Sequence, residues 1–354
     1  MNEMKSPDLA LIRRHPKPAD PFVHVDDLKV RFVSREATVK AVNGVSFDLA
    51  KGEVLCVIGE SGSGKSVMMR SLLRLHPKKR SVIEGTMMVG EHNITEVNEK
   101  TMGELRGSTI SMIFQEPMTA LDPLYTIGHQ IAETVMRHEK LDRDAAWKRA
   151  LELLELVRVP SPERRLKAYP HELSGGLRQR AMIAVALSCR PSLLLADEPT
   201  TALDASVQIQ VLVLLRKLQR DMGMSMIFVT HDLGVAAQIA DKVAVMYAGR
   251  IIEYGEARDV LVNPQHPYTK AMLASTIKDQ RRGAPLEAIA GTPPDLRALP
   301  DGCSFAPRCK YAGPDCAVTM PPPVTDARGH MARCFKVGTT NGLLAFDPHI
   351  VEPA

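Results

Sequence analysis

Residues 59–66 read GESGSGKS, a glycine-rich stretch that ends in lysine and serine. It follows a short apolar run at 52–58 and precedes a segment expected to be helical, which is the setting of a phosphate loop. Backbone N–H groups in such a loop wrap nucleotide phosphates, the lysine adds positive charge, and the serine hydroxyl can bind Mg²⁺. The residues predicted to bind ATP are Gly59, Glu60, Ser61, Gly62, Ser63, Gly64, Lys65 and Ser66.

The apolar segment LLLAD at 193–197 ends in an acidic residue, and a second acid follows it. Asp197 is expected to hold Mg²⁺, and Glu198 is placed to polarise an attacking water as a general base. Acidic residues often end strands, so this pair alone would indicate little. Together with the phosphate loop it predicts nucleotide hydrolysis.

A second anion-binding motif, LSGGLRQR, lies at 173–180. Ser174 is a suitable N-cap, and the following glycines leave backbone N–H groups bare. One triphosphate needs only one such loop. We therefore predict that Leu173, Ser174, Gly175 and Gly176 bind the γ-phosphate of a nucleotide that another subunit holds.

Four of the six cysteines gather near the end of the chain. Cys303, Cys309, Cys316 and Cys334 are separated by five, six and seventeen residues. Four thiolates can bind Zn²⁺ or a [4Fe–4S] cluster, and these gaps lack the paired spacing usual for structural zinc. His330 is a further candidate ligand, less suitable than the cysteines. The two other cysteines lie in apolar segments and are expected to be core residues.

Apolar residues often alternate between 22 and 49, which predicts antiparallel strands with one buried face. Strand-like and helical segments then alternate between about 190 and 247, which indicates a parallel α/β sheet. The segment 144–157 has helical periodicity. Beyond about residue 269 prolines become frequent, so we place a domain boundary near 270.

The 354 residues are 45% hydrophobic and 24% charged, with a formal net charge of +4. The basic residues are spread along the chain, so no nucleic-acid partner is predicted. No apolar run approaches the ~20 residues needed to span a bilayer, and the first residues do not resemble a signal peptide. A cytoplasmic location is expected, with peripheral attachment to membrane proteins left open.

These motifs together resemble an ABC transporter nucleotide-binding domain over residues 22–265, with LSGGLRQR as the signature. The resemblance implies an α/β P-loop NTPase fold with a RecA-like core, an antiparallel β subdomain and a helical subdomain at about 116–173. It gives an N-terminal extension at 1–21 and a nucleotide-binding domain at 22–270. A loop-rich C-terminal domain with a metal-cluster or regulatory role would occupy 271–354.

The same resemblance assigns further residues. Gln115 matches the Q-loop glutamine that touches Mg²⁺ or the attacking water, and His231 matches the switch histidine that contacts the γ-phosphate. Asp204 matches the D-loop aspartate, and Phe32 is the candidate for stacking on adenine. Leu177 departs from the glutamine found in many family members, but the serine and glycines that bind phosphate are present.

Within this family, HPYTKAML at 266–273, GTPPDLRALPDGCSFAPRC at 291–309 and FQEPMTALDP at 114–123 resemble ATPase subunits of bacterial oligopeptide and dipeptide importers. The resemblance implies an ATPase at the cytoplasmic face of the inner membrane that powers peptide import. Its partners would be a second ATPase subunit (a copy or a paralogue), two permeases and an external substrate-binding protein. It also implies a [4Fe–4S] cluster on the four cysteines, with Zn²⁺ as the alternative.

Other functions remain open at this stage. The cargo could be nickel, an opine, glutathione or a sugar, and a soluble nucleic-acid-linked ABC ATPase or an iron–sulfur redox protein is a further alternative. We expect the cysteine cluster to hold the proline-rich tail together, with redox sensing as the competing role.

Overall fold

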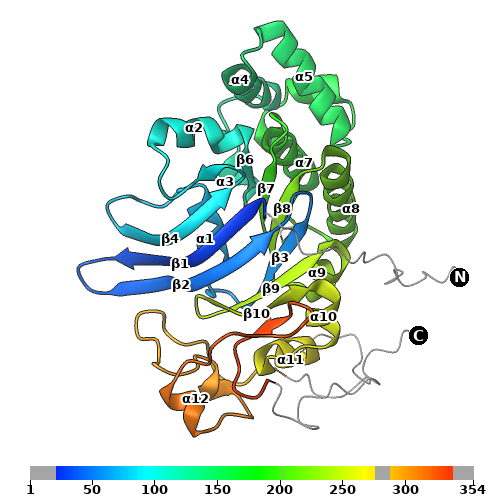
Figure 1. Cartoon of the computed structure of the whole chain (residues 1–354). Coiled ribbons are helices and arrows are strands. Elements are labelled where there is room, and N and C mark those ends of the chain that lie inside the picture. Colours follow the sequence, from blue (N-terminus) through cyan, green and yellow to red (C-terminus); the bar gives the residue numbers. More distant parts are fainter. Residues whose placement is uncertain (1–20, 202, 276–287, 338–354) are drawn as a thin grey trace, which may run out of the picture.

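The computed structural model describes residues 21–201, 203–275 and 288–337. Nearly all of the predicted N-terminal extension and parts of the predicted C-terminal domain lie outside these ranges. Two sheets, a set of helices and a C-terminal segment rich in loops make up the described part (Figure 1). This is the expected α/β fold with an antiparallel subdomain.

The smaller sheet is antiparallel and has the strand order β2-β1-β4-β5. Its first two strands pair over nearly their whole length, as the alternation at 22–49 predicted. The bounds of its strands are β1 (Val23–Val33), β2 (Thr38–Leu49), β4 (Ser81–Val89) and β5 (His92–Asn93).

The larger sheet has the order β11-β12-β10-β9-β3-β8-β7-β6. Its five strands from β9 to β6 are parallel, as predicted, and the other three extend one edge in antiparallel fashion. The bounds are β3 (Val54–Ile58), β6 (Ile110–Ile113), β7 (Leu193–Asp197), β8 (Ser225–Thr230), β9 (Lys242–Tyr247), β10 (Arg250–Glu256), β11 (Val324–Thr325) and β12 (Met331–Ala332).

Helices cover this sheet and form a lobe at one end of the molecule, where α4 and α5 lie (Figure 1). Helices α3 to α6 lie within the range expected for a helical subdomain. The bounds are α1 (Lys65–Leu72), α2 (Glu99–Ser108), α3 (Pro117–Ala120), α4 (Ile127–Glu139), α5 (Arg143–Leu156), α6 (Pro162–Leu166), α7 (Gly175–Ala186), α8 (Ala205–Met222), α9 (Leu233–Ile239), α10 (Ala257–Val262), α11 (Pro267–Ala274) and α12 (Pro314–Val318).

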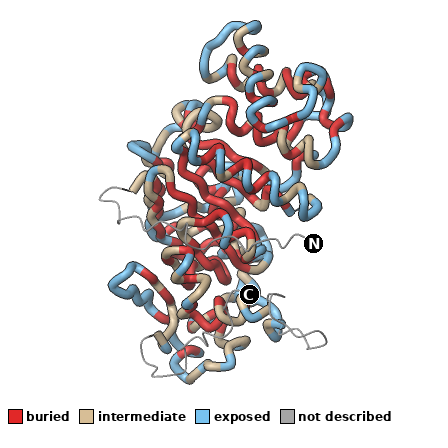
Figure 2. The backbone as a smooth tube through the Cα atoms, turned by 90° about the vertical axis from the view of Figure 1, so that its right-hand side faces the viewer, coloured by how far each residue is buried: buried red, intermediate tan, exposed pale blue. Residues whose placement is uncertain are grey.

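The five parallel strands of the larger sheet are buried on both faces, which explains their continuous apolar sequences. Successive residues of a strand point to opposite faces, so β3 sends Cys56 and Ile58 into one core and Leu55 and Val57 into the other. The second core also packs against the antiparallel sheet and α1. Figure 2 shows this buried interior as a continuous central region.

The C-terminal segment with α12 lies at the end opposite the α4–α5 lobe (Figure 1). It is attached to the larger sheet, because β12 pairs with Glu253 and Tyr254 of β10. Phe305 of this segment is 3% exposed and belongs to the core beneath the sheet. The domain boundary near 270 stays a prediction. Within the described part, no helix is long and apolar enough to cross a lipid bilayer.

Candidate functional site

The candidate residues gather where neighbouring parallel strands end. The phosphate loop follows β3, His231 follows β8, Glu198 follows β7, and Gln115 lies two residues beyond β6. Because these strands are parallel neighbours, their carboxyl ends share one edge of the sheet. That edge is where open α/β sheets bind ligands.

Two glycines let the phosphate loop approach its surroundings closely. Gly59 has φ of 151°, and a Cβ there would lie 2.2 Å from the carbonyl oxygen of Met246. Gly64 has φ of 103° and is the N-cap of α1, and its Cβ would lie 2.3 Å from the carbonyl oxygen of Ala41. Both positions therefore require glycine.

Lys65 is folded back onto its own loop. Its Nζ donates to the carbonyl oxygens of Gly59 at 2.7 Å and Glu60 at 2.9 Å. Burial lowers the pKa of Lys65, while Glu198 and other nearby carboxylates oppose that effect. The ammonium is thus held beside the loop by these two carbonyl oxygens.

Ser66 and Asp197, the two residues predicted to hold Mg²⁺, lie in contact with each other. The Ser66 hydroxyl donates to Oδ1 of Asp197 at 2.8 Å. Asp197 is fully buried, its burial raises its pKa, and its Oδ2 has no hydrogen-bond partner among the described residues. Arg70 lies 3.6 Å from that oxygen. A buried carboxylate oxygen without a hydrogen bond, next to a hydroxyl, fits a hard divalent cation.

Glu198 brings the candidate catalytic residues together. Its Oε2 accepts hydrogen bonds from Gln115 Nε2 at 3.3 Å and Thr201 Oγ1 at 2.9 Å. His231 Nδ1 lies 3.2 Å from the same oxygen. Gln115 and His231 are exposed, so this carboxylate faces the open end of the sheet. The arrangement can orient a water next to a γ-phosphate.

Phe32 and Asp204 have structural partners as well as predicted roles. Phe32 is half-buried, and its ring meets His76 edge-on with centroids 5.3 Å apart. Asp204 is the N-cap of α8 and accepts from the backbone N–H of Val207 at 3.0 Å. Neither contact tests the predicted stacking or D-loop role.

The signature residues lie at the start of α7. Ser174 occupies the expected N-cap position, but its hydroxyl makes no cap hydrogen bond. Ser174 and Gly175 are exposed, whereas Leu173 is 3% exposed and anchors the turn. No hydrogen bond or ion pair within the described chain joins these residues to the phosphate loop. Their exposed polar groups are free to meet a ligand from outside.

The four clustered cysteines line one pocket, together with His266, Phe305 and Tyr311. All four are free thiols, and burial raises the pKa of Cys303, Cys309 and Cys334. Within the described ranges, no set of three or more His, Cys, Asp or Glu side chains is arranged to hold a metal ion. The four cysteines therefore share a pocket, while their role as ligands stays a prediction.

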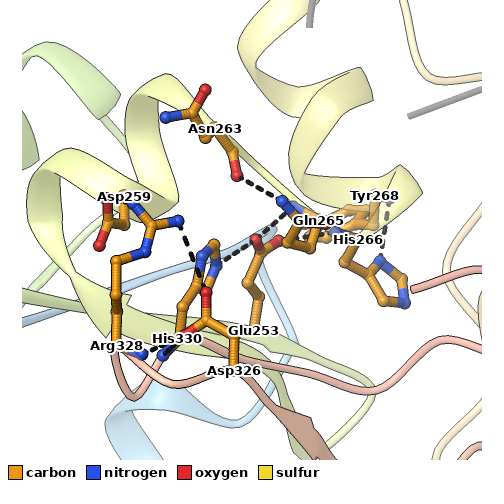
Figure 3. Close-up of polar contacts among 9 residues, drawn as sticks. All are labelled: Glu253, Asp259, Asn263, Gln265, His266, Tyr268, Asp326, Arg328 and His330. Atoms are coloured by element: carbon orange, nitrogen blue, oxygen red, sulfur yellow. Dashed lines mark hydrogen bonds and ion pairs between the residues drawn. The ribbon is translucent and has the colours of Figure 1, made fainter. Parts of the chain in front are cut away.

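A buried polar network fixes residues 324–334, the arm that carries Cys334 (Figure 3). The fully buried Glu253 carboxylate accepts from the backbone N–H of His266 at 3.0 Å and lies 2.8 Å from His330 Nε2. Arg328 of the same arm pairs with Asp259 at 3.2 Å. His330 is therefore engaged with Glu253 and does not line the cysteine pocket.

Three residues near these sites were not among the predicted set. Thr201 donates to Glu198, and Arg70 lies beside Asp197. Arg308 contacts the phosphate loop from the cysteine segment, which is residues 288–337. Spacing reveals none of these contacts: Arg308 lies within the stretch 291–309, yet its partner is 248 residues away.

Comparisons with known proteins find two family matches along the chain. The chain matches the ABC transporter family over residues 42–201 and the oligopeptide/dipeptide transporter C-terminal region over 252–316. Cys303, Cys309 and Cys316 lie inside the second match, and Cys334 lies beyond it.

Among curated relatives, the dipeptide transport ATP-binding protein DppD of Bacillus subtilis is 47% identical over 88% of this chain and 93% of its own. The oligopeptide transport ATP-binding protein OppD of Salmonella typhimurium is 45% identical over 91% of this chain and 95% of its own.

Among solved structures, the dimeric post-hydrolysis state of the ATP-binding cassette MJ0796 bound to ADP and Pi has a TM-score of 0.60. It is 27% identical and covers 67% of this chain and 99% of its own. The structure of cbiO1 from Clostridium perfringens gives 0.58 at 27% identity, covering 68% of this chain and 90% of its own. The chain therefore belongs to the ATP-binding proteins of the oligopeptide/dipeptide ABC transporter family, and its nucleotide site is that of an ATPase.

Proposed function

We propose that this chain hydrolyses ATP to power the import of oligopeptides or dipeptides through a membrane ABC transporter. The observation that carries the proposal is the meeting of Gln115, His231 and Glu198 beside the phosphate loop. The peptide cargo rests on the match of residues 252–316 and on the names of the DppD and OppD relatives.

Each site residue has a role in this reaction. The loop N–H groups bind the phosphates, and Lys65 leaves its two carbonyl partners to meet a phosphate oxygen. Ser66, Asp197 and Gln115 would hold Mg²⁺, which when bound neutralises charge on the phosphates. Glu198 accepts a proton from water as that water attacks the γ-phosphorus, while the bond from the γ-phosphorus to the bridging oxygen breaks and ADP leaves. His231 contacts the γ-phosphate.

The signature supports a two-subunit site. Ser174 and Gly175 are exposed, and α7 presents its N-terminus to whatever approaches them. In the proposed complex, a second ATPase subunit, a copy or a paralogue, completes each nucleotide site with these residues and Asp204. The MJ0796 cassette, a related fold, was solved as a dimer. ATP favours the closed pair, and hydrolysis removes that bias.

The remaining partners follow from transport. Two permeases would receive the closing motion at the helical subdomain, and an external binding protein would deliver the peptide. The chain would then lie peripherally on the cytoplasmic face of the inner membrane. The basic residues form no stripe in the sequence, so nucleic acid is not included among the partners.

We also propose that Cys303, Cys309, Cys316 and Cys334 bind a [4Fe–4S] cluster, with Zn²⁺ as the alternative. Their shared pocket supports this proposal. A single Zn²⁺ needs four sulfurs about 2.3 Å from one point, whereas a cluster is larger and needs its thiolates further apart. The cluster would hold the loop-rich segment together.

Transport can be tested directly. The chain, its permeases and its binding protein would be reconstituted in vesicles, and ATP-dependent uptake of labelled di- and oligopeptides would be measured. We expect uptake that Glu198→Gln abolishes. ATP-driven uptake of nickel, glutathione, an opine or a sugar without peptide uptake would contradict the cargo. Hydrolysis that needs DNA or RNA and no permease would contradict the transporter role.

A further inference from the structure

The phosphate loop is tied to the cysteine segment by one arginine. Arg308, next to Cys309, donates two hydrogen bonds to the Glu60 carboxylate, from Nη1 at 2.7 Å and from Nη2 at 3.0 Å. Its side chain is only 5% exposed, and that of Glu60 is 28% exposed. This is a shielded bidentate pair, which is the strong and directional form of an ion pair.

Glu60 is held at three points. Besides the carboxylate, its backbone N–H donates to the Tyr268 hydroxyl at 3.0 Å, and its carbonyl oxygen accepts from Lys65 Nζ at 2.9 Å. The bond to Lys65 has to break when the ammonium turns to a nucleotide phosphate. Arg308 and Tyr268 then remain to keep this part of the loop in place.

Arg308 and Tyr268 both belong to the packing around Tyr247 and Phe305, beside the pocket of the four cysteines. Phe305 lies 5.4 Å from Tyr268 and 5.4 Å from Tyr247, measured between ring centroids. The Tyr247 hydroxyl accepts from Arg308 at 3.2 Å. Phe305 also lines the pocket of the four cysteines. The packing around those cysteines thus continues without a break to Glu60.

The pair also matters electrostatically. Glu60 is the second residue of a loop that receives a polyanion, and an unpaired carboxylate there would repel the phosphates. Arg308 cancels that charge, and its hydrogen bonds to Glu60 raise its own pKa further. The guanidinium also donates to the carbonyl oxygens of Ala290 and Ile289, which fix its direction.

We propose that Arg308 is a positioning residue for the phosphate loop, which neutralises and fixes Glu60 and makes the affinity for ATP depend on the packing of the cysteine pocket. The inference rests on the proposed ATPase function. It adds a residue outside the nucleotide motifs. It also gives the contacts through which a change in the cysteine segment would alter ATP binding.

The test measures Mg·ATP binding to the full-length chain, purified anaerobically, by isothermal titration calorimetry, and KM and kcat of the assembled transporter. Arg308→Gln should weaken ATP binding and raise KM about tenfold, with kcat changed less than about twofold. Arg308→Lys should give a smaller loss, because it keeps the charge but not the bidentate geometry. Arg297→Gln changes an exposed arginine of the same segment that pairs with the nearby Asp295, and this variant should bind ATP like the parent.

The double variant Arg308→Gln/Glu60→Gln separates charge from packing. Removing the carboxylate should recover most of the affinity that Arg308→Gln loses, because nothing is left to repel the phosphates. A purely structural role would make the double variant as weak as the single one or weaker. Unchanged affinity in Arg308→Gln, or no recovery in the double variant, would overturn the inference. If Arg308→Gln does not fold, the Lys variant and the double variant decide.

A double-mutant cycle tests whether Cys309 and Arg308 act together on ATP binding. Cys309→Ser should weaken ATP binding when Arg308 is present and add little in the Arg308→Gln background. Fully additive effects would contradict the coupling. Failure of the parent protein to bind ATP at all would instead contradict the proposed function, so the two failures are distinguishable.

Discussion

Nδ1 of His231 and Oε2 of Glu198 lie 3.2 Å apart, at the ends of neighbouring parallel strands β8 and β7. Gln115 donates to the same oxygen from the end of the next strand. This carboxylate oxygen of Glu198 therefore contacts both Gln115 and His231, and the three residues are far apart in the chain. This convergence puts Glu198 at the centre of the candidate catalytic residues, and several tests follow from it and from the surrounding contacts.

Glu198→Gln should abolish steady-state hydrolysis while leaving ATP binding intact. An amide cannot accept the proton of the attacking water, and loss of a general base costs about 10²–10⁴-fold in rate. Phosphate release and ATP binding would be measured on the same preparation. Hydrolysis within a few-fold of the parent rate would contradict the assignment of Glu198 as the base.

Ser174→Arg should block hydrolysis in the assembled transporter but not ATP binding to the isolated chain. The exposed N-cap of α7 would meet the partner's nucleotide, and a bulky side chain there would keep the two subunits apart. Ser161→Arg is a matched control, because Ser161 is also an exposed N-cap without a side-chain cap hydrogen bond. Normal hydrolysis by Ser174→Arg, paired with a partner that carries the same change, would contradict the two-subunit site.

His76→Gln should reduce the acid sensitivity of folding. Nε2 of His76 lies 3.0 Å from both the Ser71 hydroxyl and the Val67 carbonyl oxygen, and burial lowers its pKa below 6.5. As pH falls below about 6.5, the unfolded chain therefore binds a proton that the folded chain resists, and stability is lost. Thermal unfolding between pH 5 and 8 should show a shallower decline in the variant. Parallel curves would contradict the prediction.

Anaerobically purified protein should contain about four iron and four acid-labile sulfide per chain, as expected for a [4Fe–4S] cluster. Cys316→Ser should lower both contents, because Cys316 lines the shared pocket. Cys189→Ser is the control, since Cys189 is a free thiol outside that pocket and should leave the contents unchanged. One zinc and no iron would contradict the cluster and leave the ATPase site untouched.

Much of the nucleotide site could be predicted from the sequence because it consists of local motifs. The strand β3, the glycine-rich turn and Lys65 lie within a few residues of one another, so spacing alone identifies them. The alternation of strand-like and helical segments also predicted the parallel sheet. Phe32 and Asp204 are placed in the structure, yet their roles toward adenine and the partner subunit stay predictions.

The sequence by itself determined which residues could do chemistry: the phosphate loop, the acidic end of β7, the signature and the four cysteines. Only the tertiary structure decided that Glu198 shares one oxygen with Gln115 and His231, and that Arg308 neutralises Glu60 across 248 residues. Motifs are local, whereas these pairs depend on strand order and on how the C-terminal segment docks on the sheet. No periodicity in the chain encodes such long-range contacts.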